Sequence, residues 1–147
     1  MENEIVDLIK GMCGEAEYMS PIGWHFMFNE RHYFYARSNG LGSIRFCIPH
    51  LFTASDYDEV KLTAAINETN RNVKYIKVVV FECGSVSLGY DHKIIDGEQI
   101  ENIIPHMFLW LLSYLQKDGE QIENIIPHMI KALDFASQYL IDKLNRI

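Results

Sequence analysis

The chain contains none of the short motifs that identify the common nucleotide-binding sites. Neither a P-loop motif nor the glycine-rich dinucleotide fingerprint occurs in its 147 residues. The glycine-containing stretches 40–42 and 84–85 are too short to hold a phosphate, and both are predicted to be turns.

Cysteine is scarce as well. Cys13, Cys47 and Cys83 are an odd number without CxxC spacing, and each is flanked by apolar or small residues. This pattern predicts buried free thiols in a reducing compartment.

The chain also lacks a long hydrophobic run and a signal-peptide pattern. Its most apolar run, residues 103–115, is 13 residues long and is interrupted by polar residues and a proline. A membrane span needs about 18 residues, so a buried or interface helix is expected there. The N-terminal residues 1–5 have neither a basic start nor an apolar core, which predicts a cytoplasmic protein without a membrane anchor.

Positive charge is in the minority. The chain has 13 basic and 20 acidic residues, a net charge of −7, and its basic clusters, such as residues 74–77, are short. Affinity for nucleic acid comes mainly from Lys and Arg, so no nucleic-acid partner is expected.

Apolar side chains are present in sufficient number for one core. Hydrophobic residues make up 48% of the chain and aromatic residues 12%. No Ser/Pro-rich linker interrupts the sequence, so residues 1–147 are predicted to form a single domain.

The first part of the chain predicts a helix followed by a β-hairpin. Apolar residues at helical spacing favour a helix over residues 3–13, with Gly14 as its stop. Two β-prone stretches, 22–28 and 32–37, flank a two-residue turn and predict the hairpin.

A third strand and a second helix are expected next. The strand begins over residues 44–48, and Pro49 is expected to end it or to confine it to an edge. Ser55, with Asp58 three residues later, resembles a capping box for a helix that extends to about Asn70.

The β-branched run within residues 74–83 predicts a strand at the centre of the sheet. Val78 and Val80 should face one side and Val79 the other, all three buried. A last strand is expected over residues 86–92. The expected fold is α+β, with a single antiparallel sheet of about five strands packed on helices in the order α-β-β-β-α-β-β-α.

The final helical region is duplicated. Residues 96–107 recur without a change as residues 118–129, 22 positions later, which indicates a recent genetic duplication. Each copy has an apolar stripe at helical spacing: Ile100, Ile103, Ile104 and Met107 in the first, and Ile122, Ile125, Ile126 and Met129 in the second. The second copy continues as an amphipathic helix to Leu144 and is expected to pack on the sheet.

Each copy contains a proline that should interrupt a regular helix. Pro105 and Pro127 lack an amide hydrogen, so a kink or a restart is predicted, with Asn102 and Asn124 as alternative N-caps. Two separate helices over 96–117 and 118–145 are favoured, and one continuous helix is the alternative.

The first copy is followed by residues that are apolar nearly all round, 108–115. Such a helix needs cover from the first helix, from the second copy or from another subunit. A homodimer is therefore one expected arrangement.

The sequence of residues 65–70, Ala-Ile-Asn-Glu-Thr-Asn, closes a helix just before the strand expected over 75–82. This layout resembles the YbjN family of small bacterial proteins, described as regulators of sensory transduction, whose fold is similar to that of type III secretion chaperones. The resemblance covers most of residues 3–145, and the second repeat departs from it. It implies a non-enzymatic, chaperone-like or regulatory domain that binds another protein or peptide.

The candidate partner-binding residues are aromatic or amide side chains, and they comprise Trp24, Phe26, Phe28, Asn67, Asn70, Phe108 and Trp110. Trp24, Phe26 and Phe28 alternate with other residues, so one face of that strand should be core and the other an apolar surface able to receive a peptide. Asn67 and Asn70 are expected to form hydrogen bonds at a helix end, and partner contact is the alternative.

No metal site is predicted. His106 and His128 are one repeated residue, and neither has a Cys, His or Asp partner at ligand spacing. Both are expected to be solvated or to lie at the edge of the core.

No catalytic residue and no cofactor are predicted either. Cys83 with His92, or Cys47 with His50, could suggest a thiol nucleophile, but no oxyanion-hole signature accompanies them and burial is expected. The alternative to a protein-binding module is a small-molecule-binding or enzymatic domain with an unrecognised pocket. A deep pocket lined by convergent polar groups would favour that alternative.

Overall fold

The computed structural model describes residues 2–38, 43–93 and 120–145. The expectations for the first repeat copy and for the apolar run after it, including Phe108, Trp110, Pro105 and His106, lie outside the described residues.

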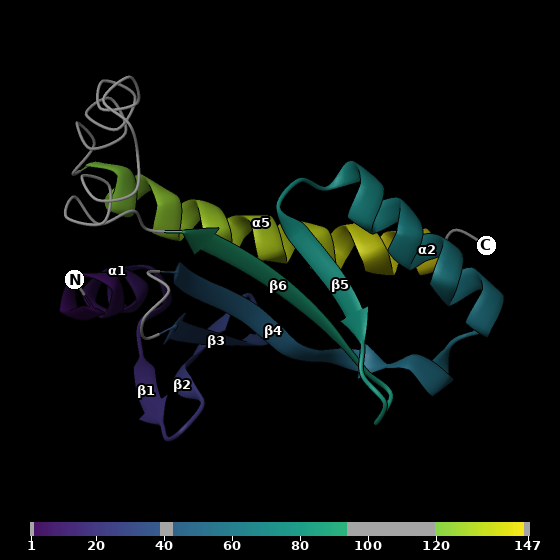
Figure 1. The fold of residues 1–147 in the computed structure, drawn as a ribbon, viewed down its shortest axis with the longest axis horizontal. Helices are drawn as coiled ribbons and strands as arrows, with labels where there is room; N and C mark the ends of the chain where they lie inside the picture. The colour runs from purple at the N-terminus through teal and green to yellow at the C-terminus, as the bar shows by residue number, and fades with distance from the viewer. Residues whose placement is uncertain (1, 39–42, 94–119, 146–147) are drawn as a thin grey trace, which may run out of the picture.

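The described residues form one six-stranded antiparallel sheet and three α-helices (Figure 1). The elements in chain order are α1 (Glu2–Cys13), β1 (Ala16–Met19), β2 (Gly23–Phe28), β3 (Arg31–Ser38), β4 (Ser43–Thr53), the short 3-10 helix η1 (Ala54–Asp56), α2 (Glu59–Asn72), β5 (Ile76–Val80), β6 (Ser85–Lys93) and α5 (Glu120–Asn145). The order across the sheet is β1-β2-β3-β4-β6-β5, so β1 and β5 are its two edges.

The helices cover one face of the sheet, which we call the inner face. α5 runs along the molecule and contacts α1 near one end and α2 near the other (Figure 1). The fully buried side chains of the core come from the inner face of the strands and from α1 and α5, among them Phe26, Tyr33, Tyr35, Phe46, Leu88, Ile5, Ile9, Ile126 and Met129. The opposite, outer face has no helix over it in the described part of the chain.

The predicted α+β class is confirmed, but the sheet has six strands and not about five. The additional strand is β1, whose four residues Ala-Glu-Tyr-Met carry no β-branched side chain. β1 is a strand because it pairs with β2, with Ala16 opposite Phe26 and Met19 opposite Gly23. Its own sequence does not predict this pairing.

The first helix and the hairpin follow the prediction. α1 ends at Cys13, and Gly14 follows with a φ of 94°, a conformation that suits glycine. Asn29 and Glu30 join β2 to β3 with φ values of 50° and 66°, as a two-residue hairpin turn requires.

The prediction for Pro49 is wrong. β4 lies between β3 and β6 and continues through Pro49 to Thr53. The β3 ladder reaches only Cys47, and the β6 ladder is irregular between Ile48 and Phe52. Pro49 therefore lies where neither neighbouring strand needs its missing amide hydrogen.

The start of the second helix also differs from the prediction. Ser55 lies in η1, and the N-cap of α2 is Asp58, whose carboxylate accepts a hydrogen bond of 3.1 Å from the Lys61 amide. Asp58 is thus the capping residue itself and not the fourth residue of a box that begins at Ser55.

The strand predicted to be central, β5, is an edge strand. Val78 is 5% exposed, whereas Val79 and Val80 are 43% and 45% exposed. Val79 faces the uncovered outer side of the sheet, and Val80 is the last residue of the strand. A β-branched run indicates a strand but does not show that both of its faces are covered.

α5 continues through Pro127 without a restart, so the predicted N-cap at Asn124 is wrong. The expectation that the second copy packs on the sheet is confirmed, because Ile126 and Met129 are fully buried. Burial of the two side chains, at about 1.5–3 kcal/mol each, together offsets the cost of about 3 kcal/mol for a proline inside a helix.

Candidate functional site

The aromatic residues of β2 lie on the inner face of the sheet, as the alternation predicts. Phe26 is 1% exposed and belongs to the core, so it cannot contact a partner in this fold. Trp24 and Phe28 are partly buried against the same core.

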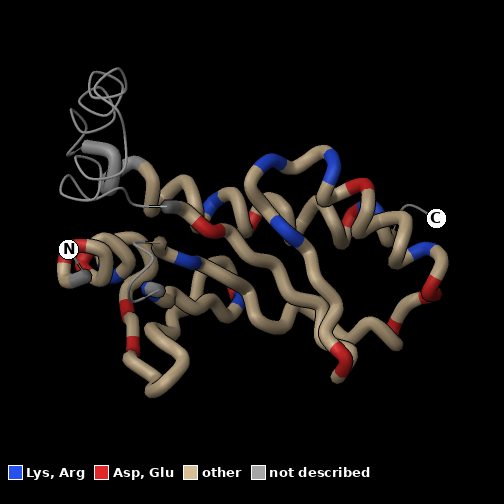
Figure 2. Tube along the Cα trace, viewed as in Figure 1, with Lys and Arg blue, Asp and Glu red and all other residues tan. Residues whose placement is uncertain are grey.

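The outer face presents a row of histidine, phenylalanine and cysteine side chains. His25 Nε2 and His32 Nδ1 are 2.8 Å apart, and the two rings stack. Phe34 packs on His25, and Cys47 lies opposite Phe34 on the next strand. In the described ranges, no group of three or more His, Cys, Asp or Glu residues could hold a metal ion. Most of the sheet is uncharged, while acidic and basic residues are interspersed along α2 and α5 (Figure 2).

The β5 edge of the sheet is closed by a side chain. Asn70, on α2, accepts a hydrogen bond of 2.7 Å from the Val78 amide and donates one of 3.3 Å to the Val78 carbonyl. Alternate residues of an edge strand present both groups outward, where a further strand would pair. The Asn70 carboxamide therefore occupies the place of a seventh strand at the middle of β5.

The β1 edge has no such guard among the described residues. Met19 accepts a hydrogen bond of 2.8 Å from the Ile22 amide, on the side of β2. Because backbone groups alternate along a strand, those of Tyr18 and Ala16 face away from β2. The side chains of Tyr18 and Met19 are 55% and 43% exposed.

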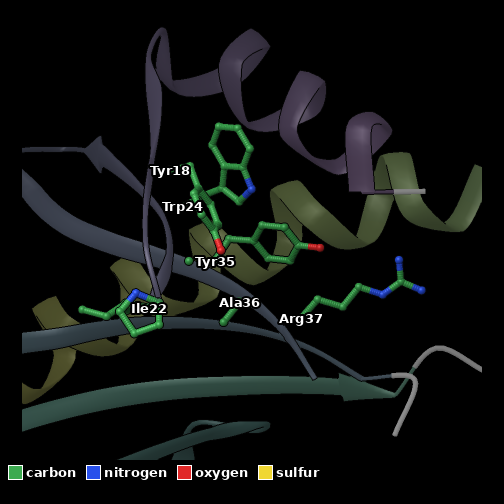
Figure 3. Close-up of a pocket in the computed structure, with 8 residues that line it drawn as sticks. Tyr18, Ile22, Trp24, Tyr35, Ala36 and Arg37 are labelled. Atoms are coloured by element: carbon green, nitrogen blue, oxygen red, sulfur yellow. The ribbon is translucent and has the colours of Figure 1, made fainter. Parts of the chain in front are cut away.

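A pocket of about 450 Å³ opens beside β1, at the corner where β2 and β3 part. The β2–β3 ladder ends at Trp24 and Tyr35, so Ala36 and Arg37 extend past the last β2 partner. The pocket is lined by Tyr18, Pro21, Ile22, Gly23, Trp24, Tyr35, Ala36 and Arg37 (Figure 3).

Aromatic rings form much of the pocket wall. The Tyr18 and Trp24 rings meet edge to face with centroids 5.5 Å apart, and Tyr35 lies beside them (Figure 3). The Lys10 ammonium of α1 lies 5.9 Å from the Trp24 ring centroid. Of the eight lining residues only Arg37 carries a charge.

Gly23 fixes the geometry of this corner. Its φ is 142°, and a Cβ at this position would clash with the carbonyl oxygen of Tyr35. Glycine therefore allows the start of β2 to approach β3 closely.

The remaining candidate residues lie apart from the pocket. Asn67 is exposed on α2, whereas the side chain of Asn70 makes the hydrogen bonds to β5 described above and not the expected hydrogen bonds at the helix end. His128 is exposed on α5, and its Nδ1 is 3.3 Å from the Tyr90 hydroxyl.

The thiols form no nucleophile–base pair with the suggested histidines. Cys83 lies before the start of β6 and His92 lies near its end, so the two are at opposite ends of this strand. His50 contacts Ser85 instead of Cys47, with its Nδ1 2.8 Å from Ser85 Oγ. Cys83 is exposed, whereas Cys13 and Cys47 are only partly buried, so the prediction of three buried thiols is wrong. Burial raises the pKa of Cys13 to about 11 and also raises the pKa of Cys47, whereas a hydrogen bond from the Ser85 backbone lowers the pKa of Cys83.

Sequence reasoning identified Trp24 but missed Tyr18, Tyr35 and Arg37. The available signal was the pair Pro21-Ile22 followed by Gly23, a turn next to an aromatic strand. The strand β1 was not predicted, so the corner that it makes with β2 and β3 could not be.

In comparisons with known proteins, no family model matches the chain, and no curated protein matches it significantly. None of the helices described is long and apolar enough to cross a membrane.

Proposed function

We propose that this chain is a non-enzymatic protein-binding module that receives an extended segment of another protein along the free edge of β1. The observation that carries the proposal is the position of the pocket directly beside that edge. A backbone edge supplies affinity for any extended chain, and an adjacent pocket supplies selectivity for one of its side chains.

The geometry supports this division of roles. An added strand would exchange main-chain hydrogen bonds with Ala16 and Tyr18, whose backbone groups face outward. Tyr18 lies opposite Trp24 and shares the inner side of the sheet with it. A peptide side chain opposite Tyr18 would therefore lie on the side of the Tyr18–Trp24 ring pair, where both rings line the pocket.

The resemblance to the YbjN family agrees with a chaperone-like or regulatory binding role in a bacterial cytoplasm, and we keep that role as part of the proposal. Among the described residues, the α-helices and strands expected from the sequence differ from the observed ones by β1 alone. The proposed site is thus built on the strand that the resemblance did not supply.

A small-molecule-binding domain is the second candidate. A volume of about 450 Å³ lies within the usual range of ligand pockets, about 300–1,000 Å³. An enzyme or a small-molecule receptor would fill the pocket without using the β1 edge, so the two candidates differ in whether the backbone of β1 takes part.

The test is a selection of binders from a random linear peptide library. The Trp110→Phe variant keeps Trp24 as the single tryptophan, since the chain has two. Selected peptides should change the emission of Trp24, because its ring lines the pocket. Tyr18→Ala should weaken binding about tenfold, the loss of roughly 1.4 kcal/mol of contact.

Phe135→Ala is the matched control, because Phe135 is also a largely exposed aromatic residue, 61% against 55% for Tyr18, but lies on α5. Binding should be unchanged in this variant. Failure to select any peptide, or selected peptides that leave Trp24 emission and the Tyr18→Ala affinity unchanged, would refute the proposal. Light scattering in the same samples separates peptide binding from self-association of the chain.

A further inference from the structure

The cation of the pocket, Arg37, has no acidic partner among the described residues. The ion pairs of the structure use other cations: Arg31 with Asp134, Arg45 with Asp91, and Lys143 with Glu68. Arg37 is exposed at the end of β3, and its side chain extends beside Tyr35 in the pocket wall (Figure 3).

The surroundings of Arg37 favour an anion. Among the eight described residues that line the pocket there is no Asp or Glu. The one carboxylate of β1, Glu17, pairs with His25 in the strand register and so lies on the outer face of the sheet. Lys10 places a second positive charge near the pocket, with its ammonium 5.9 Å from the Trp24 ring centroid.

The net charge of the whole chain limits the attraction between Arg37 and an anion to short distances. A net charge of −7 repels anionic ligands at a distance, so an anion that binds here must be held by contacts within the pocket itself, where Arg37 is the charged lining residue among those described. A guanidinium pairs best with a planar carboxylate, with which it forms two parallel hydrogen bonds.

We propose that the pocket selects a carboxylate on the bound peptide, held by Arg37 while the adjoining apolar part of the peptide packs on Tyr18 and Trp24. This inference rests on the proposed function of the β1 edge. The carboxylate has two sources, an Asp or Glu side chain or the free C-terminus of the peptide, and both present the same chemistry to Arg37.

The experiment uses four fluorescein-labelled series made from each selected peptide sequence. The series combine an acidic or an amide side chain (Glu or Gln) with a free or an amidated C-terminus. Dissociation constants are measured by fluorescence polarisation for the full chain and for Arg37→Gln, Arg37→Lys and Arg71→Gln. Arg71 is the matched control, an exposed arginine in the last turn of α2.

Peptides with a carboxylate are expected to bind about tenfold more tightly than their neutral counterparts, as for one charge-assisted pair at a partly exposed site. The preference should disappear in Arg37→Gln, shrink in Arg37→Lys and persist in Arg71→Gln. The series that shows the preference identifies the side chain or the C-terminus as the source.

Two results separate this inference from the proposed function. If neutral and acidic peptides bind equally and still need Tyr18, carboxylate selection is wrong and the peptide site stands. If no series binds, the peptide site itself is wrong. A preference that survives in Arg37→Gln also overturns the role of Arg37, and thermal melts of both Arg37 variants establish that they are folded.

Discussion

At the β5 edge of the sheet, the Asn70 side chain of α2 forms hydrogen bonds with both backbone groups of Val78. At the β1 edge, no side chain in the described part of the chain bonds in this way to the outward backbone groups. Both edges expose apolar side chains: Val79 and Val80 of β5 are exposed by 43% and 45%, and Tyr18 and Met19 of β1 by 55% and 43%. An open apolar edge invites pairing with other chains, and a hydrogen-bonding side chain blocks it.

The open edge is short and carries a charge, features that limit non-specific pairing. β1 has four residues and includes Glu17. The comparison teaches that exposed apolar side chains do not by themselves mark a binding edge: the availability of the backbone decides it. By that criterion β1, and not the strongly β-prone β5, is the edge that accepts a partner.

The largest effect is expected within β5 itself. Val78→Asp should unfold the domain, because a buried carboxylate without a partner costs several kcal/mol, on the order of the total stability. Val79→Asp should melt within a few degrees of the parent protein, since Val79 is 43% exposed on the uncovered face. Thermal melts followed by circular dichroism measure both, and equal effects at the two positions would contradict the burial of Val78 on the inner face and the exposure of Val79 on the outer face.

Opening the closed edge should have an intermediate effect. Asn70→Ala removes two hydrogen bonds to Val78, worth about 0.5–1.5 kcal/mol each, and frees the backbone of β5. We expect a loss of about 2 kcal/mol in urea unfolding and a concentration-dependent association in light scattering. Asn67→Ala, three residues earlier and exposed, is the control that should change neither. A monomeric Asn70→Ala protein of unchanged stability would show that Asn70 does not guard the edge.

The sequence predicts the helices and strands of this fold better than it predicts which strands lie next to one another in the sheet. Periodicity and turn residues correctly indicate α1, the β2–β3 hairpin, β6 and the packing of the second repeat copy, because each signal is local. Whether β5 is central or at an edge depends on where β6 pairs, which no pattern inside residues 76–80 encodes. The same holds for Pro49, which is tolerated because the β3 ladder ends at Cys47 and the β6 ladder is irregular beside Pro49.

The candidate site was predictable only in part, for the same reason. Trp24 stands in a recognisable aromatic strand, but the pocket exists because β1 pairs with β2 and Gly23 approaches Tyr35. Arg37 becomes a pocket residue because β3 extends past the end of β2. These are relations between strands, and a single sequence carries no direct signal for them.

The smallest effect concerns the cysteines near the two edges. Cys83, in the β5–β6 turn, is exposed and its pKa is lowered, so part of it is thiolate near pH 8. Burial raises the pKa of Cys13, just before β1, to about 11 and keeps that thiol protonated. Iodoacetamide at pH 8 should therefore alkylate Cys83 first, and Cys83→Ser should remove the fast phase seen by mass spectrometry. A fast phase that persists in Cys83→Ser would show that a second thiol is accessible.

The most direct test of the difference between the edges is a pair of proline substitutions. Ala16→Pro and Val80→Pro each remove one outward amide hydrogen, the first from β1 and the second from β5, and proline is tolerated at such edge positions. The measurement is the dissociation constant of a selected peptide for each variant, after melts show that both are folded. We expect a loss of affinity of about tenfold for Ala16→Pro, equivalent to one main-chain hydrogen bond, and no change for Val80→Pro. Unchanged binding by Ala16→Pro, or weakened binding by Val80→Pro alone, would contradict the assignment of β1 as the receiving edge.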